Sequence, residues 1–160
     1  MVAIGIASKL WIGYNSIIGR VDHLDNFKTR VSNIIESDPN IIKYKPKLYY
    51  ETRIKSFDRI VDKINRKRRI PKDIYGLRII YSSVNPKDEF LGYYIKYSLD
   101  NEFKTLYYNK DYIVYPKENN YQSLHFGVWD NHCLFDIQVR NIDMDYWAKK
   151  GGASNYYLKK

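Results

Sequence analysis

The sequence has little cysteine and little histidine, and both shortages exclude kinds of site. Cys133 is the only cysteine among 160 residues, so the chain cannot form an internal disulfide, and a reducing, cytoplasmic compartment is expected. The residues that follow it, Leu134 and Phe135, indicate a buried strand. The three histidines are scattered and no Cys/His cluster occurs, which argues against a structural zinc site.

Long apolar runs are also lacking. No run approaches the roughly 20 residues that a membrane-spanning helix needs. The apolar stretch from Met1 to Ser8 is interrupted at Lys9 and lacks a basic start. We therefore expect neither a signal peptide nor a membrane partner.

Positive charge, by contrast, is in excess. The chain has 27 Lys+Arg against 18 Asp+Glu and a formal net charge of +9, which favours anionic partners such as nucleotides or nucleic acid. A soluble basic protein without such a partner would have the same balance. Hydrophobic residues make up 44% and charged residues 28%, which is typical of a folded domain rather than of a disordered chain.

Periodicity and turn signals predict a fold of the α+β class, a mixed five-stranded β-sheet with helices packed on it. The expected helices span 25–36, 57–69, 89–97 and 143–150, with Pro86 near the start of the third. The expected strands span 48–54, 75–81, 103–108, 121–129 and 133–140. Asp130 and Asn131 are expected to form the turn of a hairpin between the last two strands.

Two acidic residues would meet at one rim of the sheet if their strands were neighbours. Asp73 directly precedes the strand 75–81, and Asp136 lies within 133–140, where it shares a face with Gln138. Adjacent carboxylates repel unless a cation neutralises them, and Mg²⁺ is commonly held by one or two carboxylates plus substrate phosphates. From the pattern alone, a turn cap for Asp73 and a solvent-facing position for Asp136 is the preferred interpretation.

Basic residues gather around the start of the second expected helix. Arg53 and Lys55 alternate along a strand, so both point to one face, directly before Ser56, the expected N-cap. Arg59 and Lys63 follow on one side of the helix. Helix N-termini attract phosphate and arginine adds bidentate donors, so this group could hold a triphosphate. Surface cations on an exposed helix explain the same pattern equally well.

Two other features can also be interpreted either as parts of a binding site or as ordinary structural features. The run 66–69 is entirely basic, which suits either a solvated helix end or a phosphate site. Tyr121 follows Asn119 and Asn120, which favour a tight turn, so its ring could stack on a purine. A tyrosine packed within a strand is the preferred alternative on this pattern alone.

Taken in order, the segments from Arg53 to Tyr157 resemble the synthetase domain of the RelA/SpoT family, which makes the alarmone (p)ppGpp. The matching segments are Arg53-Ile-Lys-Ser56 with Lys63, Asp73-Ile-Tyr-Gly-Leu-Arg78, the loop from Asp111 to His125, and Asp136-Ile-Gln-Val-Arg140. The resemblance implies a nucleotidyltransferase-like fold. It also implies that residues 1–50 are an N-terminal helical segment of the same domain and that residues 51–160 are its catalytic core.

The same resemblance implies a chemistry and a set of site residues. Pyrophosphate would pass from ATP to the ribose 3′-hydroxyl of GDP or GTP, with Mg²⁺ bound by Asp73 and Asp136. Asp136 would also be the base for the hydroxyl, and Tyr121 would stack on the guanine. The implied ATP-binding residues are Arg53, Lys55, Ser56, Arg59, Lys63 and Arg78. The implied acceptor-binding residues are Lys117, Asn119, Tyr121, Gln122, His125, Gln138 and Arg140.

The chain departs from the family's motifs at several positions. Asp136 stands where the family has Glu and is one carbon shorter, Arg59 stands where a Ser is frequent, and Asn120 replaces a Gly. The closing motif differs at Lys149, Ser154, Asn155 and Tyr156. Two alternatives to (p)ppGpp synthesis therefore stay open: the same transfer to the 3′ end of tRNA, and binding of nucleotide or RNA without turnover. Assembly into a homo-oligomer is compatible with the resemblance.

Overall fold

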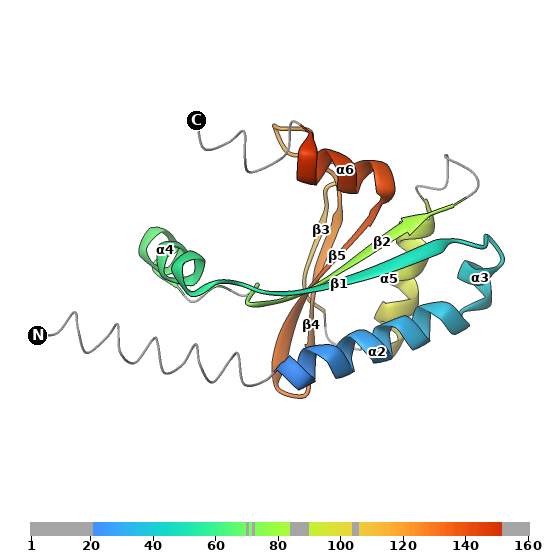
Figure 1. The fold of residues 1–160 in the computed structure, drawn as a ribbon, viewed down its shortest axis with the longest axis horizontal. Coiled ribbons are helices and arrows are strands. Elements are labelled where there is room, and N and C mark those ends of the chain that lie inside the picture. Colours follow the sequence, from blue (N-terminus) through green and yellow to red (C-terminus); the bar gives the residue numbers. More distant parts are fainter. Residues whose placement is uncertain (1–20, 70, 72, 84–89, 104–105, 152–160) are drawn as a thin grey trace, which may run out of the picture.

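The computed structural model describes residues 21–69, 71, 73–83, 90–103 and 106–151 (Figure 1). The elements follow in the order α2 (Val21–Ser37), α3 (Pro39–Ile42), β1 (Lys47–Ile54), α4 (Phe57–Lys67), β2 (Tyr75–Ser82), α5 (Phe90–Glu102), β3 (Leu106–Asp111), β4 (Leu124–Asp130), β5 (Cys133–Asn141) and α6 (Ile142–Lys150). This arrangement confirms the predicted α+β class with a mixed five-stranded sheet. Pro86 and the positions 154–156 of the closing motif lie outside the described residues.

The strand order in the sheet is β1-β2-β5-β4-β3. β2 and β5 are parallel, and the other neighbouring strands are antiparallel. The register of the parallel pair places Gly76 of β2 opposite Asp136 of β5. The segment that enters β2, which carries Asp73, therefore lies beside the first half of β5.

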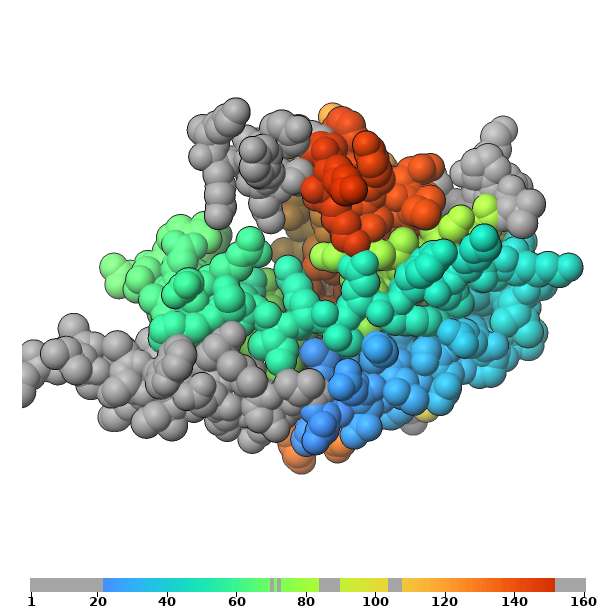
Figure 2. Space-filling model, in the orientation of Figure 1, coloured from blue at the N-terminus to red at the C-terminus, as the bar shows by residue number. Residues whose placement is uncertain are grey.

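One face of the sheet is covered by α2 and α5, and α6 lies on the other side (Figure 1). In Figure 2, the edge strand β1 runs between α2 in blue and α6 in red. Phe27, Val31 and Ile35 of α2 are at most 1% exposed, which confirms the predicted apolar side of this helix. The Phe27 ring stacks on Phe135 of β5 with 3.9 Å between ring centroids.

Alternation along β5 decides which residues reach the site. Ile137 and Val139 are fully buried in the core beneath α2 and α5. Successive side chains of a strand point to opposite faces, so Asp136 and Gln138 face the other side of the sheet. The predicted division of these four residues between two faces is confirmed.

Some boundaries differ from those predicted. The third strand begins at Leu106 rather than at 103, because α5 continues to Glu102 and Phe103 is buried against Phe27, with 5.4 Å between the ring centroids. The fourth strand begins at Leu124 rather than at 121, because the preceding residues form a loop. The short helix α3 was not predicted, although Asp38 caps it by accepting a hydrogen bond from the Asn40 N–H.

The predicted hairpin between β4 and β5 is confirmed. Its two turn residues are Asn131 and His132, with φ of 50° and 62°, so the turn lies one residue later than expected. Positive φ at both central residues is the geometry that matches the twist of a two-residue hairpin. Among the described residues, no helix combines the length and the apolar character that crossing a bilayer requires.

The core packing predicts the effect of truncating Phe27. Phe27→Ala should lower the free energy of unfolding by about 3–5 kcal/mol, because a fully buried ring leaves a cavity against Phe135. Urea denaturation followed by circular dichroism would measure this loss. Ile42→Ala, at a side chain that is 48% exposed, should change stability by only about 0.5 kcal/mol or less. Equal effects of the two substitutions would contradict the placement of α2 on the sheet.

Candidate functional site

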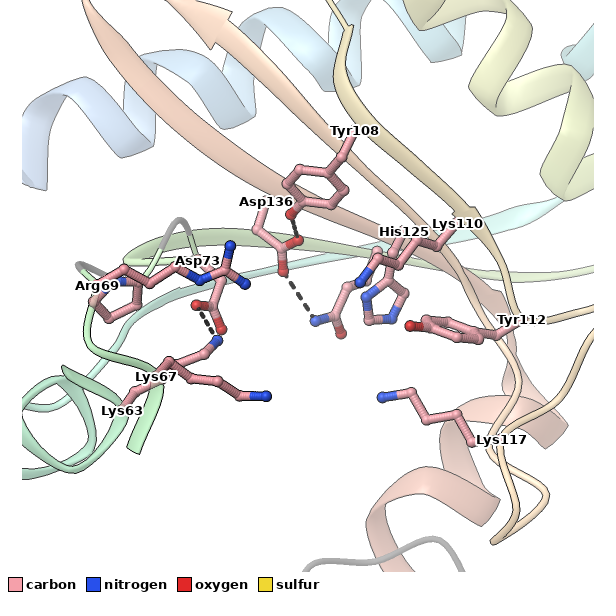
Figure 3. Close-up of a pocket in the computed structure, with 12 residues that line it drawn as sticks. Lys63, Lys67, Arg69, Asp73, Tyr108, Lys110, Tyr112, Lys117, His125 and Asp136 are labelled. Carbon is pink, nitrogen blue, oxygen red and sulfur yellow. Dashed lines mark hydrogen bonds and ion pairs between the residues drawn. The ribbon is translucent and has the colours of Figure 1, made fainter. Parts of the chain in front are cut away.

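A cavity of about 420 Å³ lies where the end of α4, the start of β2 and the strands β3 to β5 meet (Figure 3). Its lining residues are Lys63, Lys67, Arg69, Pro71, Asp73, Tyr108, Lys110, Tyr112, Lys117, His125, Asp136 and Gln138. Five of these side chains are Lys or Arg, and two are Asp. The excess of positive charge suits a polyanionic ligand such as a nucleotide.

The two predicted carboxylates line this one cavity, although Asp73 precedes β2 and Asp136 lies within β5. Asp136 is only 3% exposed, so the interpretation of Asp136 as solvent-facing is wrong. The strand pattern could not show that Tyr108, Gln138 and the other lining residues of the cavity surround Asp136 on this face.

Asp73 is held between two lysines. The Nζ atoms of Lys55 and Lys63 each lie 2.7 Å from a different oxygen of its carboxylate. Burial alone would raise the pKa of Asp73, but the hydrogen bonds and charges of the two lysines outweigh burial and lower it to about 2. Asp73 is therefore ionised at neutral pH, and the two ammonium groups neutralise it.

Asp136 has a different environment. It accepts hydrogen bonds from the Tyr108 hydroxyl and, at 3.2 Å, from Nε2 of Gln138. Burial raises the pKa of Asp136 above its ordinary value; these two hydrogen bonds oppose the rise, and the negative charge of Asp73 adds to it. The two carboxylates are thus close enough to influence each other electrostatically.

This donor set fits a hard divalent cation. Two carboxylates in one polar cavity are the oxygen ligands that Mg²⁺ takes from proteins, and such an ion would relieve their repulsion. The described part of the chain contains no group of three or more His, Cys, Asp or Glu residues able to hold a metal. The remaining ligands of an ion here would therefore come from a bound anion or from water.

The loop between β3 and β4 brings Lys117, Tyr121 and His125 together. The Tyr121 hydroxyl lies 2.7 Å from Nε2 of His125, and Lys117 Nζ lies 5.0 Å from the centre of the Tyr121 ring. Burial, and then the charges of Lys117 and Arg140, lower the pKa of His125 to about 3. His125 is therefore a neutral hydrogen-bonding group. Lys117 and His125 line the cavity, whereas Tyr121 is not among its lining residues.

Three other predicted acceptor residues form contacts that shape the same region. Asn119 Oδ1 accepts a hydrogen bond from the Tyr121 N–H at 3.2 Å, and Gln122 Nε2 donates to the Ile113 carbonyl at 3.1 Å. Arg140 is 2% exposed and forms an ion pair with Asp145 of α6 at 2.6 Å. The tight turn expected at this place is confirmed by Asn120, whose φ is 59°.

The predicted ATP-binding residues divide into three groups. Lys63 lines the main cavity and Lys55 reaches its Asp73. Arg53 and Arg78 line a smaller cavity of about 50 Å³, together with Asp136 and Gln138, and Arg78 also forms an ion pair with Glu51 at 2.7 Å. Ser56 and Arg59 are exposed and line neither cavity, and the Ser56 hydroxyl caps none of the described N–H groups of α4.

Sequence reasoning did not assign six of the lining residues to the site: Lys67, Arg69, Pro71, Tyr108, Lys110 and Tyr112. The basic run 66–69 was a signal for the first two, and the structure shows that Lys67 and Arg69 do line the cavity. Tyr108, Lys110 and Tyr112 were missed because their place in the cavity depends on how distant segments pair, which the local pattern does not encode. A tyrosine-rich strand carries no pattern that separates packing residues from lining residues.

Comparisons with known proteins find matches that cover most of the chain. A family model described as the region found in RelA / SpoT proteins matches residues 52–160. The chain is 32% identical over 143 residues to the GTP pyrophosphokinase YwaC of Bacillus subtilis, a match that covers 78% of this chain and 66% of that protein. Against the first three curated relatives, from Spiroplasma citri, Arabidopsis thaliana and Mycoplasma genitalium, the chain spans only 11%, 26% and 18% of their lengths.

Two solved structures from Bacillus subtilis share the fold. The small alarmone synthetase 2 superposes with a TM-score of 0.68 at 30% identity, covering 91% of this chain and 80% of that chain. The small alarmone synthetase 1, bound to its product pppGpp, has a TM-score of 0.70 at 24% identity, covering 91% of this chain and 82% of that one. The nucleotide in the latter belongs to that protein, and the likeness at this identity shows the fold alone.

The two lysines on Asp73 predict a loss of stability in acid. The pKa of Asp73 is about 2 when folded and close to 3.9 when unfolded, so its contribution is complete above pH ~5 and is lost as the pH falls toward 2. Asp73→Asn should cost on the order of 2 kcal/mol at pH 7 and should flatten the decline between pH 5 and pH 2. Urea denaturation at a series of pH values would measure both effects.

Asp62→Asn is the matched control for this test. Its ion pair with Arg66 lies on α4, which also carries Lys63, but the Asp62 and Arg66 side chains are 59% and 65% exposed. The pair therefore contributes little, and its removal should leave the parent's pH dependence in place. If the free energy of unfolding fell equally steeply in acid for the parent and for Asp73→Asn, the ion pairs of Asp73 with Lys55 and Lys63 would not form.

Proposed function

The chain belongs to the family defined by the region found in RelA / SpoT proteins, and we propose on this premise that it is an ATP-dependent pyrophosphokinase. Pyrophosphate would pass from ATP to the ribose 3′-hydroxyl of GDP or GTP. The observation that carries the proposal is the meeting of Asp73 and Asp136 in a cavity with five Lys or Arg side chains. The names of two relatives, a GTP pyrophosphokinase and the small alarmone synthetase 2, support the same reaction.

On the donor side, cations would bind the phosphates of ATP. Lys55 and Lys63 would exchange the carboxylate of Asp73 for phosphate oxygens, and Arg53, from the neighbouring small cavity, would add a bidentate donor. Ser56, Arg59 and Arg78 complete the proposed set of ATP-binding residues. Lys67 and Arg69 extend it along the cavity wall.

Asp73 and Asp136 would hold Mg²⁺ together with phosphate oxygens. Bound there, the ion would supply neutralisation of the charge that develops on the transferring phosphates. Asp73 suits this role because its lowered pKa keeps it ionised throughout the physiological range.

Asp136 would also be the general base. Its pKa is raised by burial, which makes the carboxylate a stronger base. The proton of the 3′-hydroxyl would pass to Asp136 as the oxygen attacks the β-phosphorus of ATP. The bond from that phosphorus to the α-phosphate oxygen breaks, and AMP leaves.

The acceptor nucleotide would lie against the loop between β3 and β4. Lys117, His125 and Gln138 line the cavity and would contact the acceptor directly. Lys117 covers one face of the Tyr121 ring, so its movement toward phosphate would open that face for stacking by guanine. Asn119, Gln122 and Arg140 would act on the acceptor by fixing this loop.

A second candidate keeps the chemistry and changes the acceptor to the 3′ end of tRNA. The placement of Lys67 and Arg69 in the cavity wall favours it, because a basic run beside the transfer site would bind an RNA backbone. Labelled ATP offered with GDP, GTP or tRNA would decide between the acceptors. A labelled guanosine 3′-pyrophosphate supports the first proposal, and label on tRNA alone overturns it in favour of the second.

The same assay tests the metal-binding acid. Asp73→Asn should lower pyrophosphate transfer by a factor of about 100 or more, because several kcal/mol of charge stabilisation depend on the bound ion. Asp62→Asn, an exposed position on α4, should keep the parent's rate. Transfer that persists in Asp73→Asn at the parent's rate would refute the assignment.

Tyr121→Leu should weaken acceptor binding selectively. Stacking on a base contributes about 1–3 kcal/mol, so the KM for GDP or GTP should rise by about 5- to 150-fold while the KM for ATP stays nearly constant. Steady-state kinetics with each substrate varied in turn would measure the two values. Tyr146→Leu, at an α6 side chain that is 64% exposed, is the control. A rise confined to the KM for ATP would exclude the stacking role.

A further inference from the structure

Five residues form one row across the whole sheet, with Asp136 at its centre. Gly76 of β2 and Gly127 of β4 lie opposite Asp136 on either side. Beyond them, Arg53 of β1 pairs with Gly76, and Tyr108 of β3 pairs with Gly127. Directly paired residues share a face of a sheet, so all five side-chain positions belong to the face that carries the site.

The two glycines leave room that the outer side chains fill. A Cβ atom at Gly127 would lie only 2.6 Å from Cε1 of Tyr108, so the tyrosine ring lies directly over the glycine. A Cβ atom at Gly76 would lie 3.2 Å from Nε of Arg53. Each edge side chain thus crosses a glycine to approach Asp136, and any larger residue at Gly127 would push the ring away.

The Tyr108 side chain, which lies over Gly127, forms a hydrogen bond with Asp136. Its hydroxyl donates to Oδ1 of Asp136, while Gln138 Nε2 donates to Oδ2 at 3.2 Å. The carboxylate is therefore held through both oxygens before any ligand binds. A ring packed over a backbone and a hydroxyl with a fixed acceptor together leave the aspartate little freedom to rotate.

We propose that Tyr108 is a positioning residue that reaches over Gly127 to fix the carboxylate of Asp136, and that this row is built for aspartate rather than for the longer glutamate. The inference rests on the proposed function, in which Asp136 binds the ion and takes the proton. An aspartate is one carbon shorter than a glutamate. Tyr108 reaches it from β3, two strands away, and its hydrogen bond fixes the position of the Asp136 carboxylate oxygens. A glutamate at this position would extend into the space that the Tyr108 hydroxyl occupies.

The test compares Tyr108→Phe, Asp136→Glu and the double variant by crystal structure and by the kinetics of pyrophosphate transfer. In Tyr108→Phe the ring stays, the Asp136 carboxylate shifts by about 1 Å, and kcat falls about 100-fold with the KM for ATP nearly unchanged. Asp136→Glu is also impaired. Adding Tyr108→Phe to it restores activity about tenfold over Asp136→Glu alone, because the obstructing hydroxyl is gone.

Tyr93→Phe is the matched control, because the Tyr93 hydroxyl donates to Oδ2 of Asp111 at 2.9 Å and neither residue lines the cavity. It removes the same kind of hydrogen bond and should leave the position of Asp136 as in the parent. Gly127→Ala provides a second route: it should displace the Tyr108 ring, and adding Tyr108→Phe to it should cause little further loss.

An unmoved carboxylate with an unchanged kcat in Tyr108→Phe would overturn the inference, as would a double variant whose losses simply multiply. The crystal structures need no turnover, so they decide the role of Tyr108 even if the parent transfers no pyrophosphate. A parent protein that transfers no pyrophosphate would instead refute the proposed function.

Discussion

The parallel pairing of β2 with β5 is the constraint on which the rest of the site depends. It places Gly76 opposite Asp136, and so brings the residues that lead into β2, with Asp73, beside the first half of β5. The register of this pair is fixed by burial, because Ile137 and Val139 fill the core under α2 and α5. A slip by one residue would turn Asp136 into that core and Ile137 into the cavity, at a large cost in desolvation.

The same arrangement shifts the pKa values of two aspartates, Asp73 and Asp136, in opposite directions. Asp73 lies between Lys55 and Lys63, which lower its pKa and keep it ionised. Asp136 lies deeper, where burial raises its pKa despite the hydrogen bonds from Tyr108 and Gln138. Such a separation of environments is how a pair of carboxylates is divided between binding a cation and exchanging a proton. Before a ligand binds, Lys55 and Lys63 also neutralise the negative charge of Asp73.

Much of this fold could be predicted from short-range pattern, and much of the site could not. Alternation in β5 and the apolar side of α2 are local signals, and each is confirmed. The burial of Asp136 was missed because alternation shows that a side chain leaves the core face but not that other segments cover it. Tyr108 was missed because its role requires three strands in register and a glycine between them. Contacts of this kind join distant segments, which no periodicity encodes.

A crystal structure with Mg²⁺ and a non-hydrolysable ATP analogue tests the central claim most directly. The account predicts one ion bound by oxygens of both Asp73 and Asp136 at about 2.0–2.1 Å, with phosphate oxygens among its other ligands. It also predicts that Lys55 and Lys63 have moved from Asp73 to the phosphates. An analogue bound elsewhere, or an ion that touches neither carboxylate while both lysines remain on Asp73, would contradict it.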